Sequence, residues 1–288
     1  MIDETVEEIQ AMQTHSSSVV AVKATWALEE LLDREYATVE EYVRALEQNG
    51  TVLRQANPSH ASLQNAVRDV VDTVADGEYA DVDDAKARTA ERIDEVVARI
   101  ESGKRRAAEN AADVLDDGAT LLTHDYSSTV LEALEYATDA GKTFDVYVTE
   151  ARPRYIGRKT ARALASMTGV EATLITDSAG GHYLEECDRV VVGMDCIVEE
   201  TLYNRVGTFQ LATAANHLEV PVTVLGSSSK LVTEGFIFEN EFRPGSEVLP
   251  EPAEGFDVEN PAYDATPVSL LESVITDEGR ETFPDARD

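Results

Sequence analysis

Apolar residues in the first part of the chain recur at helical spacing, and no strand pattern interrupts them. Thr38 and Glu41 stand in the order that forms a capping box at the start of one such run. Gly103, inside the longest run, weakens the expectation of one unbroken helix there. The sequence therefore predicts a helical N-terminal domain over residues 1–117. Its helical runs cover residues 19–33, 38–50, 63–74 and 82–115.

The pattern changes at Gly118, where short apolar runs of strand length begin to alternate with helical patterns. Each run is apolar throughout, as in strands that are buried on both faces of a parallel sheet. The fold class is therefore α/β, and right-handed crossovers predict a Rossmann-like, doubly wound parallel sheet over residues 118–288. Residues 260–280 predict a turn followed by a helix. The five expected strands lie at 119–124, 144–150, 170–176, 189–195 and 220–226.

The composition adds a strong negative charge. The 288 residues include 56 acidic and 24 basic side chains, for a formal net charge of −32. Such a field repels the phosphate backbone, so we expect no direct binding of nucleic acid. The acid is spread over the whole chain and lysine is scarce, which favours a halophilic protein in salt that shortens the Debye length to about 3 Å. Unfolding should then be harder in molar KCl than in dilute buffer.

The sequence carries no signal of a membrane protein or a secreted protein. No apolar run reaches the roughly 18 residues that span a bilayer. The acidic N-terminus, MIDETVEEIQ, lacks the basic and apolar parts of a signal peptide. The two cysteines, Cys187 and Cys196, have neither the spacing of a zinc site nor the number for a disulfide framework. These features favour a cytoplasmic protein without a metal site.

Polar clusters follow all five expected strands, at the carboxyl ends where ligands bind in doubly wound sheets. They read THDYSS, EARPR, TDSAGG, GMD and GSSSK in chain order. No GxGxxG follows the first strand and no P-loop occurs, so we expect no nicotinamide or flavin cofactor. The basic residues among these clusters favour a phosphorylated small molecule as the ligand.

The stretch GMDCIVEETLYNRVGT (193–208) carries the most specific signal. Asp195 ends an expected strand, where a carboxylate can act as a base or hold a sugar hydroxyl. The residues that follow are expected to start a helix, whose free N–H groups and positive dipole end suit a phosphate. The alternative is that Asp195 and Asn204 only cap local turns. The candidates at the helix start are Asn204, Arg205, Gly207 and Thr208.

Further basic residues stand near other strand ends. Three arginines cluster in EARPRYIGR, where guanidinium groups match phosphate bidentately, and surface salt bridges are the alternative. Lys230, after the fifth strand, could reach a phosphate or remain a solvated lysine. His124 and Asp125 end the first strand, but sequence neighbours in a strand point to opposite faces, so a dyad between them needs a bent backbone. The clustered arginines are Arg152, Arg154 and Arg158.

Together these motifs resemble the initiation factor 2B alpha/beta/delta family, whose superfamily includes methylthioribose-1-phosphate isomerase and ribose-1,5-bisphosphate isomerase. The resemblance is close over residues 119–288 and loose in the helical first part. The elements match the family in order. They are LLTH (121–124), EARPRYIGR (150–158), TLITDSA (173–179), VVVGMD (190–195), NRVGT (204–208), NPAYDATP (260–267) and VITDEG (274–279).

The resemblance implies which residues would act in an isomerase. The family's isomerases use a Cys and an Asp to move a proton or hydride between adjacent carbons of a sugar phosphate. Asp195 matches that Asp, whereas Asp125 stands where the Cys is expected. Arg205 replaces a Lys, and Met194 replaces an Ala. Residues 12–22 contain no Arg and no Gly, although the isomerases carry an RGA phosphate-binding element there.

These departures favour a non-catalytic regulatory or assembly subunit over an enzyme. The resemblance implies at least a homodimer through the C-terminal domain, with initiation factor 2 or related subunits as candidate partners. The alternative is a sugar-phosphate aldose–ketose isomerase of the ribose-1,5-bisphosphate or methylthioribose-1-phosphate type, in which Asp195 and Asp125 handle the proton. A purely structural subunit would bind no phosphate. The expected ligand, a nucleotide or sugar phosphate, would contact Arg152, Arg158, Asn204, Arg205, Gly207, Thr208 and Lys230.

Overall fold

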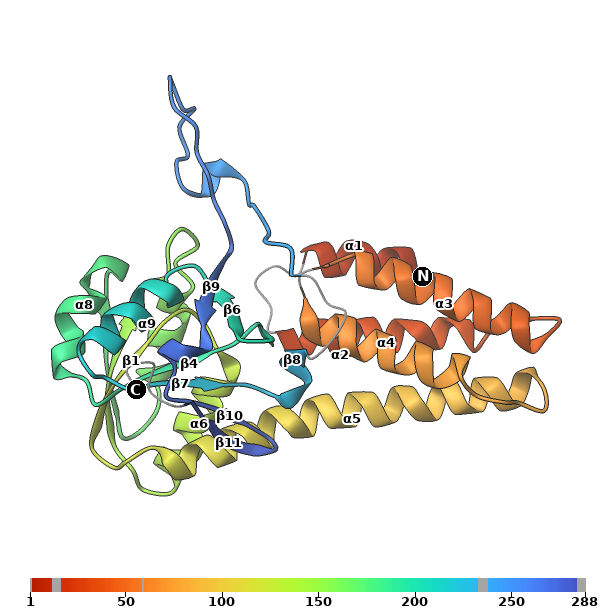
Figure 1. Cartoon of the computed structure of the whole chain (residues 1–288), viewed down its shortest axis with the longest axis horizontal. Coiled ribbons are helices and arrows are strands. Elements are labelled where there is room, and N and C mark those ends of the chain that lie inside the picture. The colour runs from red at the N-terminus through yellow and green to blue at the C-terminus, as the bar shows by residue number, and fades with distance from the viewer. Residues whose placement is uncertain (1, 12–16, 59, 233–237, 284–288) are drawn as a thin grey trace. The chain divides into compact units, whose positions relative to one another are not determined.

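The computed structural model describes residues 2–11, 17–58, 60–232 and 238–283, so part of the stretch compared with the RGA element, residues 12–16, lies outside it. The first part of the chain is helical, as expected (Figure 1). Its apolar sides meet in one core around Tyr42, Leu46 and Ile93. The helices are α1 (Ile2–Ala11), α2 (Ser17–Ala27), α3 (Val39–Gln55), α4 (Ala61–Ala75) and α5 (Val82–Val114), with a 3-10 turn at Leu28–Leu31.

The expected capping box starts α3. The Thr38 hydroxyl accepts a hydrogen bond from the Glu41 N–H at 3.2 Å. The Glu41 carboxylate reaches back and accepts one from the Ala37 N–H at 2.8 Å. One N–H group that the helix itself leaves without a partner and the N–H of the residue before the N-cap are thus satisfied, which favours a helix start here.

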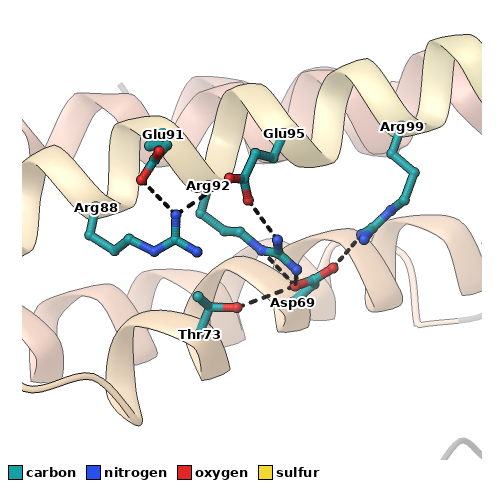
Figure 2. Close-up of polar contacts among 7 residues, drawn as sticks. All are labelled: Asp69, Thr73, Arg88, Glu91, Arg92, Glu95 and Arg99. Carbon is teal, nitrogen blue, oxygen red and sulfur yellow. Dashed lines mark hydrogen bonds and ion pairs between the residues drawn. The ribbon is translucent and has the colours of Figure 1, made fainter.

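An ion-pair network joins α4 to α5 (Figure 2). Asp69 accepts hydrogen bonds from Arg92 Nη2 at 2.5 Å and Nε at 2.9 Å, and it also pairs with Arg99. Arg92 donates in addition to Glu95 at 2.6 Å, and the Thr73 hydroxyl donates to Asp69 at 3.3 Å. Burial alone would raise the pKa of Asp69, but the hydrogen bonds and charges of Arg99 and Arg92 outweigh it and lower that pKa. Both carboxylate oxygens of Asp69 have partners.

Helix α5 is continuous over 33 residues and passes through Gly103 without a break. The chain divides within this helix into two compact units, whereas the sequence placed the boundary between residues 117 and 118. The last turns of α5 belong to the second unit because Ala108, Ala111 and Leu115 pack into the core of its sheet. The units are Met1–Gly103 with Phe236–Phe238, and Lys104–Gly235 with Glu239–Asp288.

A seven-stranded sheet forms the centre of the second unit (Figure 1). Its order is β11-β10-β7-β4-β1-β2-β3, and the pairs are parallel except β10 with β11. The chain runs outward from β1 through β2 and β3, then returns to β4 on the other side of β1. The strand order therefore reverses between β1 and β4. The strands are β1 (Ala119–Thr123), β2 (Phe144–Thr149), β3 (Val170–Ile175), β4 (Arg189–Gly193), β7 (Val222–Leu225), β10 (Ser273–Thr276) and β11 (Gly279–Thr282).

Helices cover both faces of this sheet. Neighbouring residues of a strand point to opposite faces. Leu121 packs in the core that contains α6 (Ser128–Asp139) and α7 (Gly157–Leu164). Leu122 packs in the core that contains α9 (Thr208–His217), with α8 (Gly180–Tyr183) at its margin. The predicted α/β class, with a doubly wound and mostly parallel sheet, is confirmed.

A second, four-stranded sheet was not predicted. Residues after Asp195 fold back as a hairpin, so Arg205 ends a strand, and the following helix begins only at Thr208. The helix expected within residues 260–280 is wrong, because the β-branched residues of β10 pair with β7 and continue the main sheet. A 3-10 turn at Val268–Leu270 precedes β10. The second sheet has the order β8-β5-β6-β9, with β5 (Cys196–Val198), β6 (Thr201–Arg205), β8 (Leu231–Val232) and β9 (Tyr263–Pro267).

An arm of residues 239–262 precedes β9, drawn in blue in Figure 1. Its two sides pair near the base, where the Ala262 N–H donates to the Glu241 carbonyl and the Arg243 N–H donates to the Asn260 carbonyl, each at 2.8 Å. These two hydrogen bonds hold the base of the arm next to the first residue of β9.

Among the helices of the described part of the chain, none combines the length and apolar character that crossing a bilayer would require.

Candidate active site

Two carboxylates stand where the strand order reverses. Asp125 follows β1 and Asp195 follows β4, and these strands are neighbours in the sheet. Open α/β sheets bind ligands in the crevice outside the carboxyl ends at this point, because the loops on either side diverge. Asp125 has a left-handed backbone with φ of 67°. Its carbonyl accepts a hydrogen bond from the Thr160 hydroxyl at 2.6 Å, so α7 fixes the turn that carries it.

Arg205 lies between the two carboxylates. Its Nε is 3.4 Å from Asp125 Oδ2 and 3.7 Å from Asp195 Oδ2. The β5–β6 hairpin brings it there, since the Asp195 N–H donates to the Tyr203 carbonyl at 3.2 Å and closes the hairpin. Tyr263 of β9 stands opposite Arg205 in the strand register, and its ring centroid is 4.8 Å from the guanidinium Cζ. The cation is thus enclosed by two acids and an aromatic face.

Two polar atoms of this cluster are buried without a hydrogen-bond partner among the described residues. They are Asp125 Oδ1 and Arg205 Nη1. Only 7% of the surface of Asp125 is exposed. A buried polar group without a partner costs about 1–3 kcal/mol, so such atoms in a native protein indicate a ligand or solvent partner. The cluster therefore has the chemistry of a polar binding site.

The two carboxyls have different environments. Burial raises the pKa of Asp125, while the charges of Arg205 and His124 act to lower it and the charge of Asp195 adds to the rise. The Asp195 side chain is more open, at 19% exposed against 9% for Asp125. Two carboxyls in unlike surroundings are how proteins separate an acid from a base within one site.

Lys230 is a second cation near Asp195. The residue is 9% exposed, and its Nζ donates to the Met194 carbonyl at 2.7 Å. Burial lowers the pKa of Lys230, and the charge of Asp195 acts in the opposite direction. The Met194 side chain lies against Gly226, where a Cβ would be 2.5 Å from its Cε. A larger residue at position 226 would require the Met194 side chain to move.

The fold and this cluster can be compared with known proteins. The model of the initiation factor 2 subunit family matches residues 13–282. The chain belongs to this family. It is 33% identical to the ribose 1,5-bisphosphate isomerase of Methanocaldococcus jannaschii, over 97% of this chain and 91% of the relative. A protein of the same name from Haloterrigena turkmenica is also 33% identical, over 97% and 89%. The crystal structure of Pyrococcus horikoshii OT3 translation initiation factor eIF-2B matches with a TM-score of 0.83 at 27% identity, over 98% of this chain and 97% of that chain.

These relatives contradict the expectation of a non-catalytic regulatory or assembly subunit. Proteins 30–33% identical over nearly the whole chain are named ribose 1,5-bisphosphate isomerase, so the preference against an enzyme is not supported. That preference rested on several departures from the family's isomerases taken together, among them Asp125 in the place of a Cys. Residue types alone do not show that burial raises the pKa of the Asp125 carboxyl, which favours its protonated form.

The N–H groups at the start of α9, which were expected to bind a phosphate, already donate to a carboxylate of the protein. The N–H groups of Gly207 and Phe209 both donate to Asp264 Oδ2, at 2.7 and 3.0 Å. Asn204 Nδ2 donates to the Thr208 hydroxyl at 3.0 Å, and that hydroxyl donates to a backbone carbonyl. The local-capping alternative, made for Asp195 and Asn204, thus describes the contacts of Asn204, and Gly207 and Thr208 also have partners within the protein. A phosphate role for these residues stays a prediction.

His124 links three segments and is not free for a dyad. Its Nε2 faces the Val206 carbonyl at 2.9 Å and must carry a proton, while Nδ1 is 2.6 Å from the Thr149 hydroxyl. Gly207 has φ of 110°, and a Cβ there would lie 2.8 Å from the imidazole. The imidazole therefore ties the ends of β1 and β2 to the turn before α9, which needs glycine at position 207.

Two of the three arginines after β2 pair with carboxylates of the protein. Arg154 donates to both carboxylate oxygens of Glu247, at 2.7 and 3.0 Å. Arg158 donates to the glutamate directly after β2 at 2.8 Å. Arg158 and Arg152 contact the ring of Tyr155, with Cζ 4.0 and 5.5 Å from its centroid. The salt-bridge alternative is found for Arg154 and Arg158, and a ligand role for Arg152 and Arg158 stays a prediction.

Sequence reasoning did not single out Tyr263 and Asp264. Both lie in NPAYDATP, which was noted only as part of the family resemblance. An aromatic residue followed by Asp is a weak signal by itself. The pairing of β6 with β9 is what places Tyr263 against Arg205 and Asp264 at the start of α9.

Cys196 is next to Asp195 but has no exposed surface. Burial raises the pKa of its thiol to about 12, and the charge of Asp195 adds to the rise. A thiol in this state is a poor nucleophile near neutral pH. Within the described ranges, His, Cys, Asp and Glu side chains form no group of three or more that could hold a metal ion.

Proposed function

We propose that this protein is an aldose–ketose isomerase of a phosphorylated ribose, with ribose 1,5-bisphosphate as the first substrate to test. The observation that carries the proposal is the placement of Asp125 and Asp195 on either side of Arg205 where the strand order reverses. The isomerase relatives support the substrate class. Methylthioribose 1-phosphate, named in the family resemblance, is the second substrate to test.

The conversion of an aldose 1-phosphate ring into a ketose needs one acid and one base. A proton must reach the ring oxygen as its bond to C1 breaks. The hydrogen on C2 then moves to C1, and the C2 hydroxyl loses its proton as the C2 carbonyl forms. One proton is supplied and one is removed, so the two protein groups exchange their protonation states during turnover.

Asp125 suits the role of the acid. Burial raises its pKa, so its carboxyl keeps a proton to higher pH than a solvated aspartic acid does. A carboxylic acid kept protonated in this way can donate to a substrate oxygen. The chemistry that the family resemblance assigns to a thiol therefore does not require sulfur. Asp195, whose side chain is more exposed, suits the base that takes the hydroxyl proton.

Arg205 and Lys230 suit the negatively charged parts of the substrate. Arg205 Nη1 has no hydrogen-bond partner among the described residues and can donate to a phosphate or to an oxygen that gains charge during the reaction. The Lys230 ammonium donates to the Met194 carbonyl and keeps further N–H donors. Neither role needs the N–H groups at the start of α9 that Asp264 already engages.

The decisive experiment is proton NMR of ribose 1,5-bisphosphate incubated with the purified protein in molar KCl. We expect conversion to the ketose by the wild-type protein. Asp195→Asn and Asp125→Asn should each slow it by about 10²–10⁴-fold, the usual loss on removing a general acid or base. Asp145→Asn is the matched control, because Asp145 is exposed on β2, and it should convert the sugar at the wild-type rate.

Two results would contradict the proposal. A folded wild-type protein that binds either sugar but converts neither would exclude isomerase activity on these substrates. Conversion that survives both Asp125→Asn and Asp195→Asn would place the chemistry on other residues. Circular dichroism of each variant establishes that the fold is intact before its rate is interpreted.

We also infer that the protein works in the cytoplasm as at least a homodimer through its C-terminal domain. The family resemblance supports the assembly, and the two buried free thiols suit a reducing compartment. Light scattering in molar KCl measures the mass directly. A mass of one chain at micromolar concentration would contradict the dimer.

A further inference from the structure

Among the residues that the structure describes, no short hydrogen bond fixes the guanidinium of Arg205. Its Nε lies 3.4 and 3.7 Å from the nearest oxygens of Asp125 and Asp195, beyond the distance of a strong charge-assisted bond. Its Nη1 has no partner among the described residues. Arg154, in contrast, makes two bonds of 2.7 and 3.0 Å to one carboxylate. Some contact other than hydrogen bonding to the two acids must therefore define where the Arg205 cation lies.

The ring of Tyr263 supplies that contact. Its centroid is 4.8 Å from the Arg205 Cζ, within the range of a cation–π interaction. The two residues stand directly opposite each other in the antiparallel pairing of β6 and β9. Burial raises the pKa of the Tyr263 phenol to about 12, and the charge of Asp195 adds to the rise. The ring is therefore neutral near physiological pH and presents its face to the cation.

The backbone of Tyr263 is itself held on both sides. Asn240, at the base of the arm, donates from Nδ2 to the Tyr263 carbonyl at 2.8 Å and accepts from the Tyr263 N–H at 3.2 Å. The next residue, Asp264, accepts the N–H groups of Gly207 and Phe209. The segment on which the ring stands is thus tied both to the arm and to the turn that follows Arg205.

We propose that Tyr263 is a positioning residue whose aromatic face holds the Arg205 guanidinium between Asp125 and Asp195. This inference rests on the proposed isomerase function, in which these two carboxyls exchange protons with the sugar. Loss of the ring would let the cation move away from the acids. Asp125 would then lose the charge of Arg205 that opposes its protonation, and the sugar would meet an altered acid–base pair.

The test compares variants that keep or remove the aromatic face. Tyr263→Phe keeps the ring and removes the hydroxyl. Tyr263→Met and Tyr263→Leu keep an apolar side chain and remove the ring. Each is assayed for the pH dependence of kcat and kcat/KM with ribose 1,5-bisphosphate, and for carboxyl titration by carbon NMR of aspartate-labelled protein. Asp125→Asn assigns the resonance of Asp125, and thermal unfolding shows which variants are folded.

We expect Tyr263→Phe to keep kcat within about threefold of wild type, with the same pH profile. Tyr263→Met and Tyr263→Leu should lower kcat at least about tenfold with a smaller change in KM, because the loss lies in the arrangement of the reacting groups. In both, the Asp125 carboxyl should titrate at higher pH than in wild type, since Arg205 no longer offsets burial.

The titration separates this inference from the proposed function because it needs no substrate. If the wild-type protein converts no sugar but Asp125 titrates higher in the ringless variants only, the positioning of Arg205 stands and the isomerase proposal fails. If the protein is an active isomerase but Tyr263→Phe and a folded ringless variant behave alike, Tyr263 is not the positioning residue. An equal shift of the Asp125 titration in all three variants would overturn it as well.

Discussion

Two clusters of arginine and aspartate in this protein differ in which residue is shared. In the helical unit, one carboxylate, Asp69, is shared by Arg92 and Arg99 (Figure 2). In the sheet unit, one guanidinium, Arg205, is shared by Asp125 and Asp195. The first carboxylate accepts from two guanidinium groups, one of which also donates to Glu95. The second guanidinium lies near two carboxyls, one of which also interacts with the charge of Lys230.

The difference shows in hydrogen bonding and in protonation. Both oxygens of Asp69 accept hydrogen bonds, and its arginines lower its pKa against the effect of burial. Asp125 has an oxygen without a partner among the described residues, and burial raises its pKa against the effect of Arg205. A satisfied cluster contributes to the stability of the fold. A cluster that keeps buried donors and acceptors without partners, at a cost in stability, is a candidate for function.

The largest contrast should appear in turnover. Asp195→Asn is expected to slow the conversion of ribose 1,5-bisphosphate by about 10²–10⁴-fold, because it removes the proposed base. Asp69→Asn should leave the rate per folded molecule within about twofold, since mutations outside a site rarely change the chemistry. NMR rate measurements on both purified variants check this. Equal losses in the two would mean that the clusters do not divide into structural and functional.

Stability should separate the clusters in the other direction. Asp69→Asn is expected to lower the free energy of unfolding near neutral pH by about 1–2 kcal/mol, as it removes a charge-assisted pair that is only partly shielded from water. Because the folded pKa of Asp69 is lowered, this contribution is present above the unfolded pKa and is lost as pH falls through the folded pKa. Urea unfolding at neutral and acidic pH measures it. Asp72→Asn, an exposed site on the same helix, should show neither effect.

Replacement of Asp125 should have a smaller effect of opposite sign. The pKa of Asp125 is higher in the folded than in the unfolded protein, so the folded state holds the Asp125 proton to higher pH. Stability therefore falls as pH rises above the unfolded pKa. Asp125→Asn removes the ionisable group and should raise the free energy of unfolding near neutral pH by about 1 kcal/mol. The gain should vanish at acidic pH. A loss of stability at neutral pH in urea unfolding would show that the charged carboxylate is favourable where it lies.

The smallest effect should come from the exposed partner in the helical unit. Arg99 is 49% exposed at its side chain, so Arg99→Gln should cost about 0.5 kcal/mol in dilute buffer. Molar KCl screens such pairs, and the cost should fall toward zero there.

The wild-type protein itself should resist unfolding better in molar KCl, because salt weakens the repulsion among the side chains that give its net charge of −32. Urea midpoints at the two salt concentrations test both statements, and an undiminished cost of Arg99→Gln would mean that the pair is shielded from solvent.

Apolar periodicity was sufficient to place α2 to α5 and the five strands that begin the main sheet, but it did not predict α1. It also placed Asp125 and Asp195 at strand ends, because a strand of continuous apolar residues ends where polar residues resume. It failed for the second sheet and for β10. The short strands β5 and β6 carry little alternation, and β10 was taken for a helix because a run of a few apolar residues fits either structure.

The amino-acid sequence by itself therefore determined the α/β class, the acidic surface and the strand ends at which polar chemistry could lie, since burial and periodicity are local properties of the chain. Only the tertiary structure decided which of those polar residues meet. The strand order sets β1 beside β4 and so Asp125 near Asp195, and the β5–β6 hairpin returns Arg205 between them. The pairing of β6 with β9 then brings Tyr263 against that cation. These are contacts between distant segments, and they depend on strand pairing and desolvation that local sequence patterns do not encode.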